Sequence, residues 1–377
     1  MKRVMVIAGE ASGDLHAGKL ISAALKKNAD IQFYGIGADN MRKAGAEVLI
    51  DSKDMAVVGL VEIWAHRKII FSALDQMRKA ITDNPPDLLL LVDYPEFNLR
   101  LAKHAKQHGV KVLFYISPQV WAWRQYRVKK IKRLVDMMAV VFPFEEVFYL
   151  KHHVPVQFVG HPLVNEVKPS KEKATLKKEF NLNAGQAVIG LLPGSRKSEI
   201  KRLLKTILDS ARLTKEQIHD AQFILPLADT LDESDLQPLL DEYADLNINI
   251  IKHRAYDVIH CCDVVLTVSG TVTLEIALLK TPLVIINKGA WLTYAIVSRM
   301  LKIDHIGLCN IVANKRIAPE LLQNDASPEK ISAWLIKILH DDKLREELIN
   351  GLSEVEPLLG GAGGIDNIAR LTLEMLG

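Results

Sequence analysis

The 377-residue sequence contains only three cysteines, Cys261, Cys262 and Cys309, and they form no C-x-x-C pair. A disulfide framework and a cysteine-based zinc site both need several cysteines at defined spacings. We therefore expect three buried, reduced thiols, and neither a metal nor a cofactor.

Long hydrophobic runs are also missing. No segment reaches the roughly 18 apolar residues that a membrane-spanning helix needs. The N-terminal stretch MKRVMVIAGEASGDLHAG has a short apolar run that turns into a Gly/Ser/Asp loop, which is typical of a first strand and not of a signal peptide. We expect a cytoplasmic protein.

A large excess of either charge is missing, since 48 Lys and Arg residues nearly balance 45 Asp and Glu residues and the formal net charge is only +3. An anionic partner would have to be recognised by local basic patches, and we expect no nucleic-acid partner. With 49% hydrophobic residues the chain is globular, and its length is that of two domains of roughly 150 to 200 residues.

Short apolar runs alternate with longer amphipathic stretches along both halves of the chain. Strands buried on both faces and separated by helices indicate parallel sheets, so the fold class is α/β, with two doubly wound Rossmann-like domains facing across a cleft. The charged, proline-containing stretch 154–180 is interpreted as the linker. The predicted domains are 1–165 and 166–355, followed by a C-terminal helix, 356–377, that packs on the first domain or exchanges with another chain.

The nucleotide-binding motifs G-x-G-x-x-G and G-x-x-x-x-G-K-[ST] are absent. Ligands of parallel sheets bind beyond the carboxyl ends of the strands, so we expect the site in the loops that follow strands. GEASGD, with Ser12, Gly13 and Asp14, follows the first strand and opens the first helix. Free amides at a helix start suit an oxygen-rich ligand. A plain helix cap is the alternative interpretation of this motif.

Two further loops of this kind lie in the second half. In LLPGSRKSEI, Ser195 precedes Arg196, whose guanidinium can pair with phosphate or carboxylate in a bidentate manner. In SGTVTLEIALL, Gly270 and Thr271 stand at a helix start, and Glu275 follows one turn later, where a carboxylate can hold ribose hydroxyls. Each loop alone could be capping, but the pair points to a nucleotide diphosphate.

The run LLLLVDYPEFN places Asp93 directly after a buried strand of the first half. A strand-end acid opposite a nucleotide site is a candidate general base. Glu96 and Asn98 fall near the start of the next helix and are candidate supporting residues. The alternative is that Asp93 only caps that helix.

In this order and at these spacings, the segments GEASGD, DYPEFN, YISPQVWAWR, FPFEEVFY, FVGHPL, LLPGSRKSEI and SGTVTLEIAL resemble the lipid-A-disaccharide synthase family. The resemblance runs from Val4 to about Gln323. SPQVWAWR, which contains Trp123 and Arg124, is its most specific piece.

The resemblance implies an inverting GT-B glycosyltransferase that needs no metal. It would join UDP-2,3-diacylglucosamine to 2,3-diacylglucosamine 1-phosphate, forming the β(1→6)-linked lipid A disaccharide 1-phosphate and releasing UDP. Asp93 matches the family's base for the 6-hydroxyl. The family's second acid in this motif is commonly aspartate, where this chain has Glu96. Asn310 matches a position in the nucleotide site, although Cys309 replaces the preceding proline.

Two apolar segments, 55–74 and 289–303, carry more large apolar residues than one buried stripe needs. They indicate a surface for acyl chains and for the inner face of the inner membrane, with packing between domains as the alternative. The residues expected to contact lipid are Val57, Val58, Leu60, Val61, Trp64, Ile69, Ile70 and Trp291. The basic run from Arg124 to Arg133 is either a solvated helix face or an anion contact.

Three functions remain open from the residues alone: a lipid-directed nucleotide-sugar transferase, an enzyme like UDP-N-acetylglucosamine 2-epimerase, and a nucleotide-sugar-binding protein without turnover. Fold cannot choose among them, and the resemblance favours the first. The expected partners are the two sugar substrates and a membrane surface, and a homodimer stays open.

Overall fold

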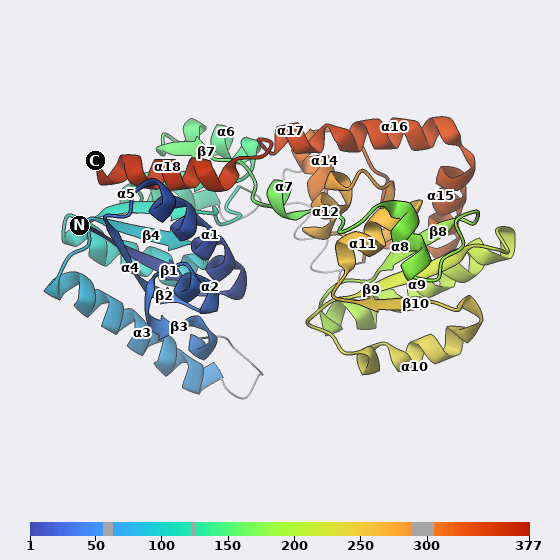
Figure 1. Cartoon of the computed structure of the whole chain (residues 1–377), viewed down its shortest axis with the longest axis horizontal. Coiled ribbons are helices and arrows are strands. Elements are labelled where there is room, and N and C mark those ends of the chain that lie inside the picture. Colours follow the sequence, from blue (N-terminus) through green and yellow to red (C-terminus); the bar gives the residue numbers. More distant parts are fainter. Residues whose placement is uncertain (56–62, 122–124, 289–304) are drawn as a thin grey trace. The chain divides into compact units, whose positions relative to one another are not determined.

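The computed structural model describes residues 1–55, 63–121, 125–288 and 305–377, with only the backbone for 63–67 (Figure 1). The chain divides into two compact units. Unit 1 comprises Met1–Pro162 and Leu359–Gly377, and unit 2 comprises Leu163–Leu358. The last residues of the chain therefore return to the unit in which it began.

Unit 1 contains a seven-stranded sheet in the order β3-β2-β1-β4-β5-β6-β7, in which all neighbouring strands are parallel. Its strands are β1 (Lys2–Ala8), β2 (Ile31–Gly37), β3 (Glu47–Asp51), β4 (Leu88–Val92), β5 (Lys111–Tyr115), β6 (Met137–Val140) and β7 (Val156–Phe158). Its helices are α1 (Ala11–Lys27), α2 (Asp39–Lys43), α3 (Ile63–Asp83), α4 (Pro95–Gln107), α5 (Val128–Leu134), α6 (Pro143–Lys151) and α18 (Gly364–Leu376).

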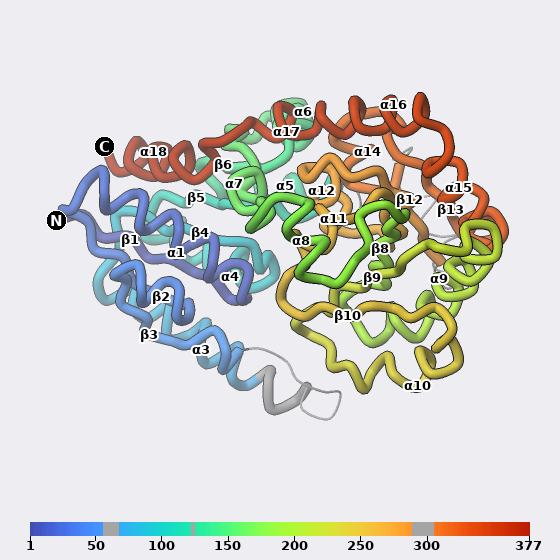
Figure 2. The backbone as a smooth tube through the Cα atoms, turned by 45° about the vertical axis from the view of Figure 1, so that its right-hand side comes forward, coloured from blue at the N-terminus to red at the C-terminus, as the bar shows by residue number. Residues whose placement is uncertain are grey.

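Both faces of this sheet are covered, which explains why its central strands are apolar throughout. Met5 and Ile7 of β1 pack with α3 and α4 in one core, whereas Val4 and Val6 pack with α1 and α18 in another. Successive side chains of a strand point to opposite faces, so a strand buried on both sides needs no polar alternation. Figure 1 shows α18 beside α1, and Figure 2 shows the same pairing from a second direction.

Unit 2 contains a six-stranded parallel sheet in the order β10-β9-β8-β11-β12-β13. Its strands are β8 (Val188–Leu192), β9 (Gln222–Leu227), β10 (Asn249–Lys252), β11 (Val264–Val268), β12 (Leu283–Asn287) and β13 (Glu320–Leu322). Its helices are α7 (Leu163–Glu166), α8 (Lys173–Glu179), α9 (Lys197–Gln217), α10 (Gln237–Leu240), α11 (Ala255–Cys261), α12 (Val272–Leu278), α14 (Leu308–Ala313), α15 (Pro328–His340), α16 (Asp342–Ser353) and α17 (Val355–Leu358).

The interpretation of 154–180 as the linker is wrong. This stretch contains β7, which completes the sheet of unit 1, and α7 and α8 of unit 2. β7 has only three residues, and the charged neighbours that follow it hid so short an edge strand in the sequence pattern. All three cysteines are buried and free.

Candidate functional site

In unit 1, the loops after β1 and β4 lie side by side because the two strands pair in parallel, with Ala8 opposite Val92. Asp93 and Tyr94 follow β4, and both have left-handed backbones, with φ of 48° and 44°. A Cβ on Gly9 would lie 2.5 Å from the Tyr94 ring, so only glycine fits there. The first glycine of GEASGD thus lets the Tyr94 ring approach the end of β1.

The backbone of Asp93 is held by two hydrogen bonds, and its carboxyl group accepts from the Tyr94 amide. Its amide donates to the Tyr115 carbonyl at 3.0 Å, and its own carbonyl accepts from Asn98 Nδ2 at 2.6 Å. Burial raises the pKa of Asp93 above its ordinary value, and the negative charge of Glu10 raises it further. A carboxylate with a raised pKa is a better acceptor for the proton of a sugar hydroxyl.

The two supporting candidates on α4 have different surroundings. Asn98 is fully buried and fixes the backbone of Asp93. Glu96 is 65% exposed and forms an ion pair with Arg127 at 2.5 Å. Asn98 is therefore a positioning residue for Asp93, and Glu96 links the start of α4 to the stretch just before α5. The other two supporting candidates, Trp123 and Arg124, lie outside the described residues.

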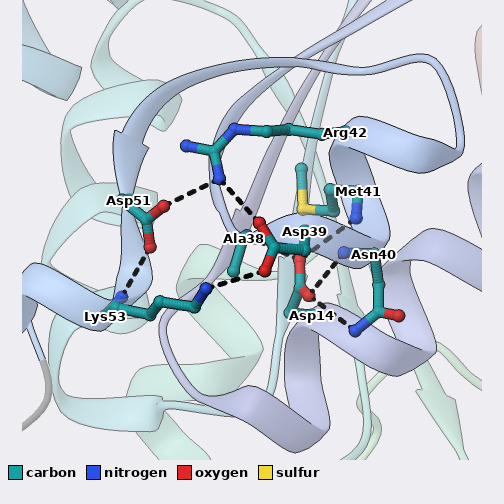
Figure 3. A network of polar contacts seen from close by, with 8 residues as sticks. All are labelled: Asp14, Ala38, Asp39, Asn40, Met41, Arg42, Asp51 and Lys53. Atoms are coloured by element: carbon teal, nitrogen blue, oxygen red, sulfur yellow. Dashed lines mark hydrogen bonds and ion pairs between the residues drawn. The ribbon is translucent and has the colours of Figure 1, made fainter.

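Asp14 was expected to contact substrate, but its carboxylate is engaged inside the unit (Figure 3). Oδ1 accepts from the amides of Ala38 and Met41, and Oδ2 accepts from the amide and the side chain of Asn40. We revise its role to support of α2, because these four donors leave the carboxylate little capacity for a ligand. Ser12 is exposed on the first turn of α1, and Gly13 is buried.

In unit 2, the loop between β8 and α9 is organised around Glu199. The amides of Ser195 and Arg196 donate to Glu199 Oε2 at 3.0 and 3.3 Å, and Arg196 Nη1 lies 3.3 Å from Oε1. A Cβ on Gly194, whose φ is 109°, would lie 2.3 Å from the same carboxylate. Arg196 remains 78% exposed. Two amides and one guanidinium that could bind a phosphate therefore surround an internal anion.

The loop between β11 and α12 presents Gly270 and Thr271 directly before the helix. A Cβ on Gly270 would meet nothing within 4 Å, so the backbone is open to a ligand there. Glu275, one turn on, is partly buried and lines a pocket of about 510 Å³ in unit 2. Burial, together with the charge of Glu166, raises the pKa of Glu275.

Asn310 was expected in the nucleotide site, but it is fully buried with every polar group paired. Its Nδ2 donates to the Ala318 carbonyl and to Glu320 Oε1, and its Oδ1 accepts from the amides of Ile317 and Ala318. Glu320 also accepts from the amides of Ile306 and Gly307. Ser269, just before Gly270, donates to the Ile306 carbonyl at 2.8 Å. Asn310 therefore supports the Gly270 loop indirectly, through Glu320 and Ile306, and its own polar groups all bond within the protein.

Three carboxyl groups within the candidate loops or the family motifs were not singled out from the sequence. Glu10 lies inside GEASGD and acts on Asp93. Glu199 stands three residues after Arg196, which is the spacing of a capping box. Glu145 accepts from Trp121 Nε1 at 3.2 Å and is 2% exposed, so burial raises its pKa to about 8. The spacing of Glu199 was a usable signal, whereas Glu10 and Glu145 depend on tertiary neighbours.

Most of the predicted lipid contacts cannot be placed. Val57, Val58, Leu60, Val61 and Trp291 lie outside the described residues, as does the side chain of Trp64. On α3, Ile69 is 40% exposed and Phe71 is 47% exposed, whereas Ile70 packs partly against the core. Across the described ranges, the structure contains no helix with the length and apolar character to cross a membrane.

Comparison with known proteins gives a family match over most of the chain. A family model described as "Lipid-A-disaccharide synthetase" matches residues 4–356. The lipid-A-disaccharide synthase of Geobacter sulfurreducens is 51% identical over 375 residues, covering 100% of this chain and 97% of that protein. The protein of the same name from Coxiella burnetii is 41% identical over 375 residues, covering 100% and 99%.

Similar solved structures support the fold class. The UDP-GlcNAc 2-epimerase of Neisseria meningitidis has a TM-score of 0.63 at 13% identity, over 100% of this chain and 99% of that one. The calicheamicin glycosyltransferase CalG4 has a TM-score of 0.60 at 14% identity, over 100% and 98%. The predicted α/β class with two parallel sheets of the GT-B type is confirmed.

Proposed function

The chain belongs to the lipid-A-disaccharide synthase family, and from that premise we propose a role for the candidate loops of each unit. The protein is a glycosyltransferase that forms the lipid A disaccharide. Its substrates are a sugar nucleotide, UDP-2,3-diacylglucosamine, and an acceptor, 2,3-diacylglucosamine 1-phosphate. Unit 1 supplies the base and unit 2 holds the UDP group.

Asp93 is the base that takes the proton of the acceptor's 6-hydroxyl. The 6-oxygen attacks C1 of the donor, the bond from C1 to the β-phosphate oxygen breaks, and the proton goes to the Asp93 carboxylate. One displacement inverts the α-linked donor to a β-linked product without a covalent sugar intermediate. The observation that carries this role is the partly buried carboxyl of Asp93, whose pKa is raised by burial and by Glu10 while its backbone is fixed by Asn98.

The loops of unit 2 bind the leaving UDP. Negative charge grows on the β-phosphate as UDP departs, and positioned donors that meet this charge lower the barrier. Arg196 supplies an exposed guanidinium, and Gly270 and Thr271 supply an open backbone before α12. Glu275 is placed one turn along the same helix to accept from the ribose hydroxyls. Neither half requires a metal in this scheme.

The epimerase alternative gains little from the structural neighbours. Their identity to this chain is 11 to 16%, which supports a shared fold and not a shared reaction. The lipid-A-disaccharide synthases at 41 to 51% identity over the whole chain instead favour the transferase. The residues of the binding loops are compatible with either enzyme.

The first test is an assay with both acylated substrates in detergent micelles containing EDTA. We expect disaccharide 1-phosphate from the native protein, because no step uses a metal. Asp93→Asn should lower kcat by about three orders of magnitude or more, since an amide cannot take the proton, while the Kd for UDP stays unchanged. UDP binding is measured by titration calorimetry.

Asp30→Asn, an exposed carboxyl of unit 1, is the matched control and should keep full activity. An undiminished Asp93→Asn variant would leave Asp93 as a helix cap and remove the proposed base. Absence of product from the native protein would contradict the substrate assignment.

A further inference from the structure

A pocket of about 490 Å³ in unit 1 has no part in the mechanism so far. This volume falls within the roughly 300–1,000 Å³ of small-molecule sites. Much of its wall is apolar or small. These wall residues are Gly9, Ala11, Ala38, Met55 and the ring of Tyr94.

On the other wall, Asp39 and Lys53 line the pocket as an ion pair, and Arg42 and Asp51 extend this ion-pair network outside the lining (Figure 3). Asp39 pairs with Lys53 at 2.7 Å and with Arg42 at 3.3 Å, and Arg42 also pairs with Asp51 at 2.7 Å. Two cations thus face two carboxylates. A charged ligand gains little net attraction from such a wall, because each cation already has its counter-ion.

The remaining charge near the pocket disfavours an anion. Glu10 lines the pocket, and its negative charge acts on Asp93. The buried carboxylate of Asp14 is occupied by the amides of α2, as described above. The pocket therefore suits an uncharged, largely apolar group, and the acceptor's 1-phosphate would lie elsewhere.

The pocket also adjoins the proposed base. Tyr94, which lines the pocket, is the residue after Asp93. Glu10 also lines the pocket, and its negative charge raises the pKa of Asp93. An acceptor whose 6-hydroxyl lies against Asp93 brings its acyl chains to this part of unit 1.

We propose that this pocket seats one acyl chain of the acceptor, between the loop after β1, the Tyr94 ring and the Asp39–Lys53 wall. The proposal rests on the proposed role of Asp93, because it takes the acceptor's position from that residue. Each methylene buried there contributes about 0.8 kcal/mol, or about fourfold in affinity.

The test uses acceptors that differ by two carbons in acyl length, with the native protein, Ala11→Phe and Ala23→Phe. Ala11 is exposed at the start of α1, so a phenyl ring there fills the pocket without entering the core. Ala23 lies on the same helix, packs partly against the core and lines a different pocket, so Ala23→Phe controls for the effect of a phenyl ring on α1 itself. Thermal unfolding of each variant checks that it is folded, and Ala11→Leu serves as a milder substitution.

For the native protein and Ala23→Phe we expect kcat/KM to fall roughly fifteenfold for every two carbons removed from the acceptor. Ala11→Phe should raise the acceptor KM by about tenfold or more and flatten this dependence, while the donor KM and the Kd for UDP stay unchanged. An Ala11→Phe variant with native length dependence would overturn the proposal while leaving the transferase assignment intact. A native protein that forms no disaccharide would instead defeat the proposed function itself.

Discussion

Asp93 and Tyr94 adopt a strained backbone conformation that neighbouring hydrogen bonds stabilise. Two consecutive left-handed residues cost of order 1–3 kcal/mol each, and Tyr94 tolerates that conformation less well than aspartate does. The hydrogen bond from Asn98 and the pairing with the Tyr115 carbonyl offset this cost. Both of these bonds use the backbone of Asp93, and its partly buried carboxyl accepts from the Tyr94 amide.

The pH dependence of the reaction tests the link between Glu10 and Asp93. A general base must be deprotonated, so kcat/KM should rise as the pH rises through the elevated pKa of Asp93. Glu10→Gln removes the negative charge that helps to raise this pKa, and the acidic limb should therefore move to lower pH. The measurement is kcat/KM against pH for both proteins.

Glu96→Gln is the matched control, because Glu96 pairs with Arg127 and does not contribute to the pKa shift of Asp93. Its acidic limb should coincide with that of the native protein. An unmoved limb in Glu10→Gln would contradict the electrostatic link. A collapse of kcat at every pH would instead make Glu10 a residue that touches the substrate.

At the scale of the element, the amides before α9 already bind a carboxylate from within that helix. Glu199 takes the amides of Ser195 and Arg196, which are donors that the proposed UDP site needs. At the proposed site, UDP would displace this carboxylate or share its donors, so we propose that the nucleotide competes with a side chain of the same helix.

Glu199→Gln should bind UDP about two- to fivefold more tightly than the native protein. A glutamine can still accept from the loop amides, but it lacks the charge that pairs with Arg196, and such an exposed pair is worth about 0.2–1 kcal/mol. Titration calorimetry gives the Kd. Glu346→Gln on α16 makes the same change of net charge and should leave the Kd as it is. Weaker binding in Glu199→Gln would show that the carboxylate aims Arg196 and does not compete.

Elements with long or strongly apolar patterns were predictable, and so were the loops that follow them. β4 is five buried aliphatic residues, and that run alone placed Asp93 at a strand end. β7 and β13 have three residues each, too few for a periodicity to appear. The roles of Asp14 and Asn310 could not be read from sequence either, because an acid or amide after a strand looks the same whether its partner is a ligand or a distant backbone amide.

At the scale of the whole molecule, the return of the chain to unit 1 decides where its last helix packs. Ile368, Ala369 and Leu371 of α18 join the core formed by α1 and the central strands of unit 1. The sequence shows that this helix has an apolar stripe, but a stripe fits any apolar face of similar width. Its partner is set by which face of the sheet the first helices leave uncovered, and that is a property of the assembled unit.

Substrates with acyl chains require the molecule to meet a lipid surface, and we propose that α3 provides part of that contact. Phe71 and Ile69 are exposed, and the Arg100 guanidinium lies 5.6 Å from the centre of the Phe71 ring. Lys68 is exposed on the same helix. Apolar side chains beside basic ones are typical of helices that lie in a membrane interface containing anionic lipid.

Phe71→Glu should weaken binding to vesicles that contain anionic lipid by roughly tenfold, since burial of a phenylalanine side chain is worth about 1.5–3 kcal/mol. The new carboxylate would also pair with Arg100 and repel the lipid headgroups. Co-sedimentation with vesicles measures the affinity, and activity in detergent micelles should change little. Val147→Glu, an exposed valine on α6 of the same unit, is the matched control and should bind as the native protein does. Equal losses in both variants would assign the effect to net charge, and no loss in either would remove α3 from the membrane contact.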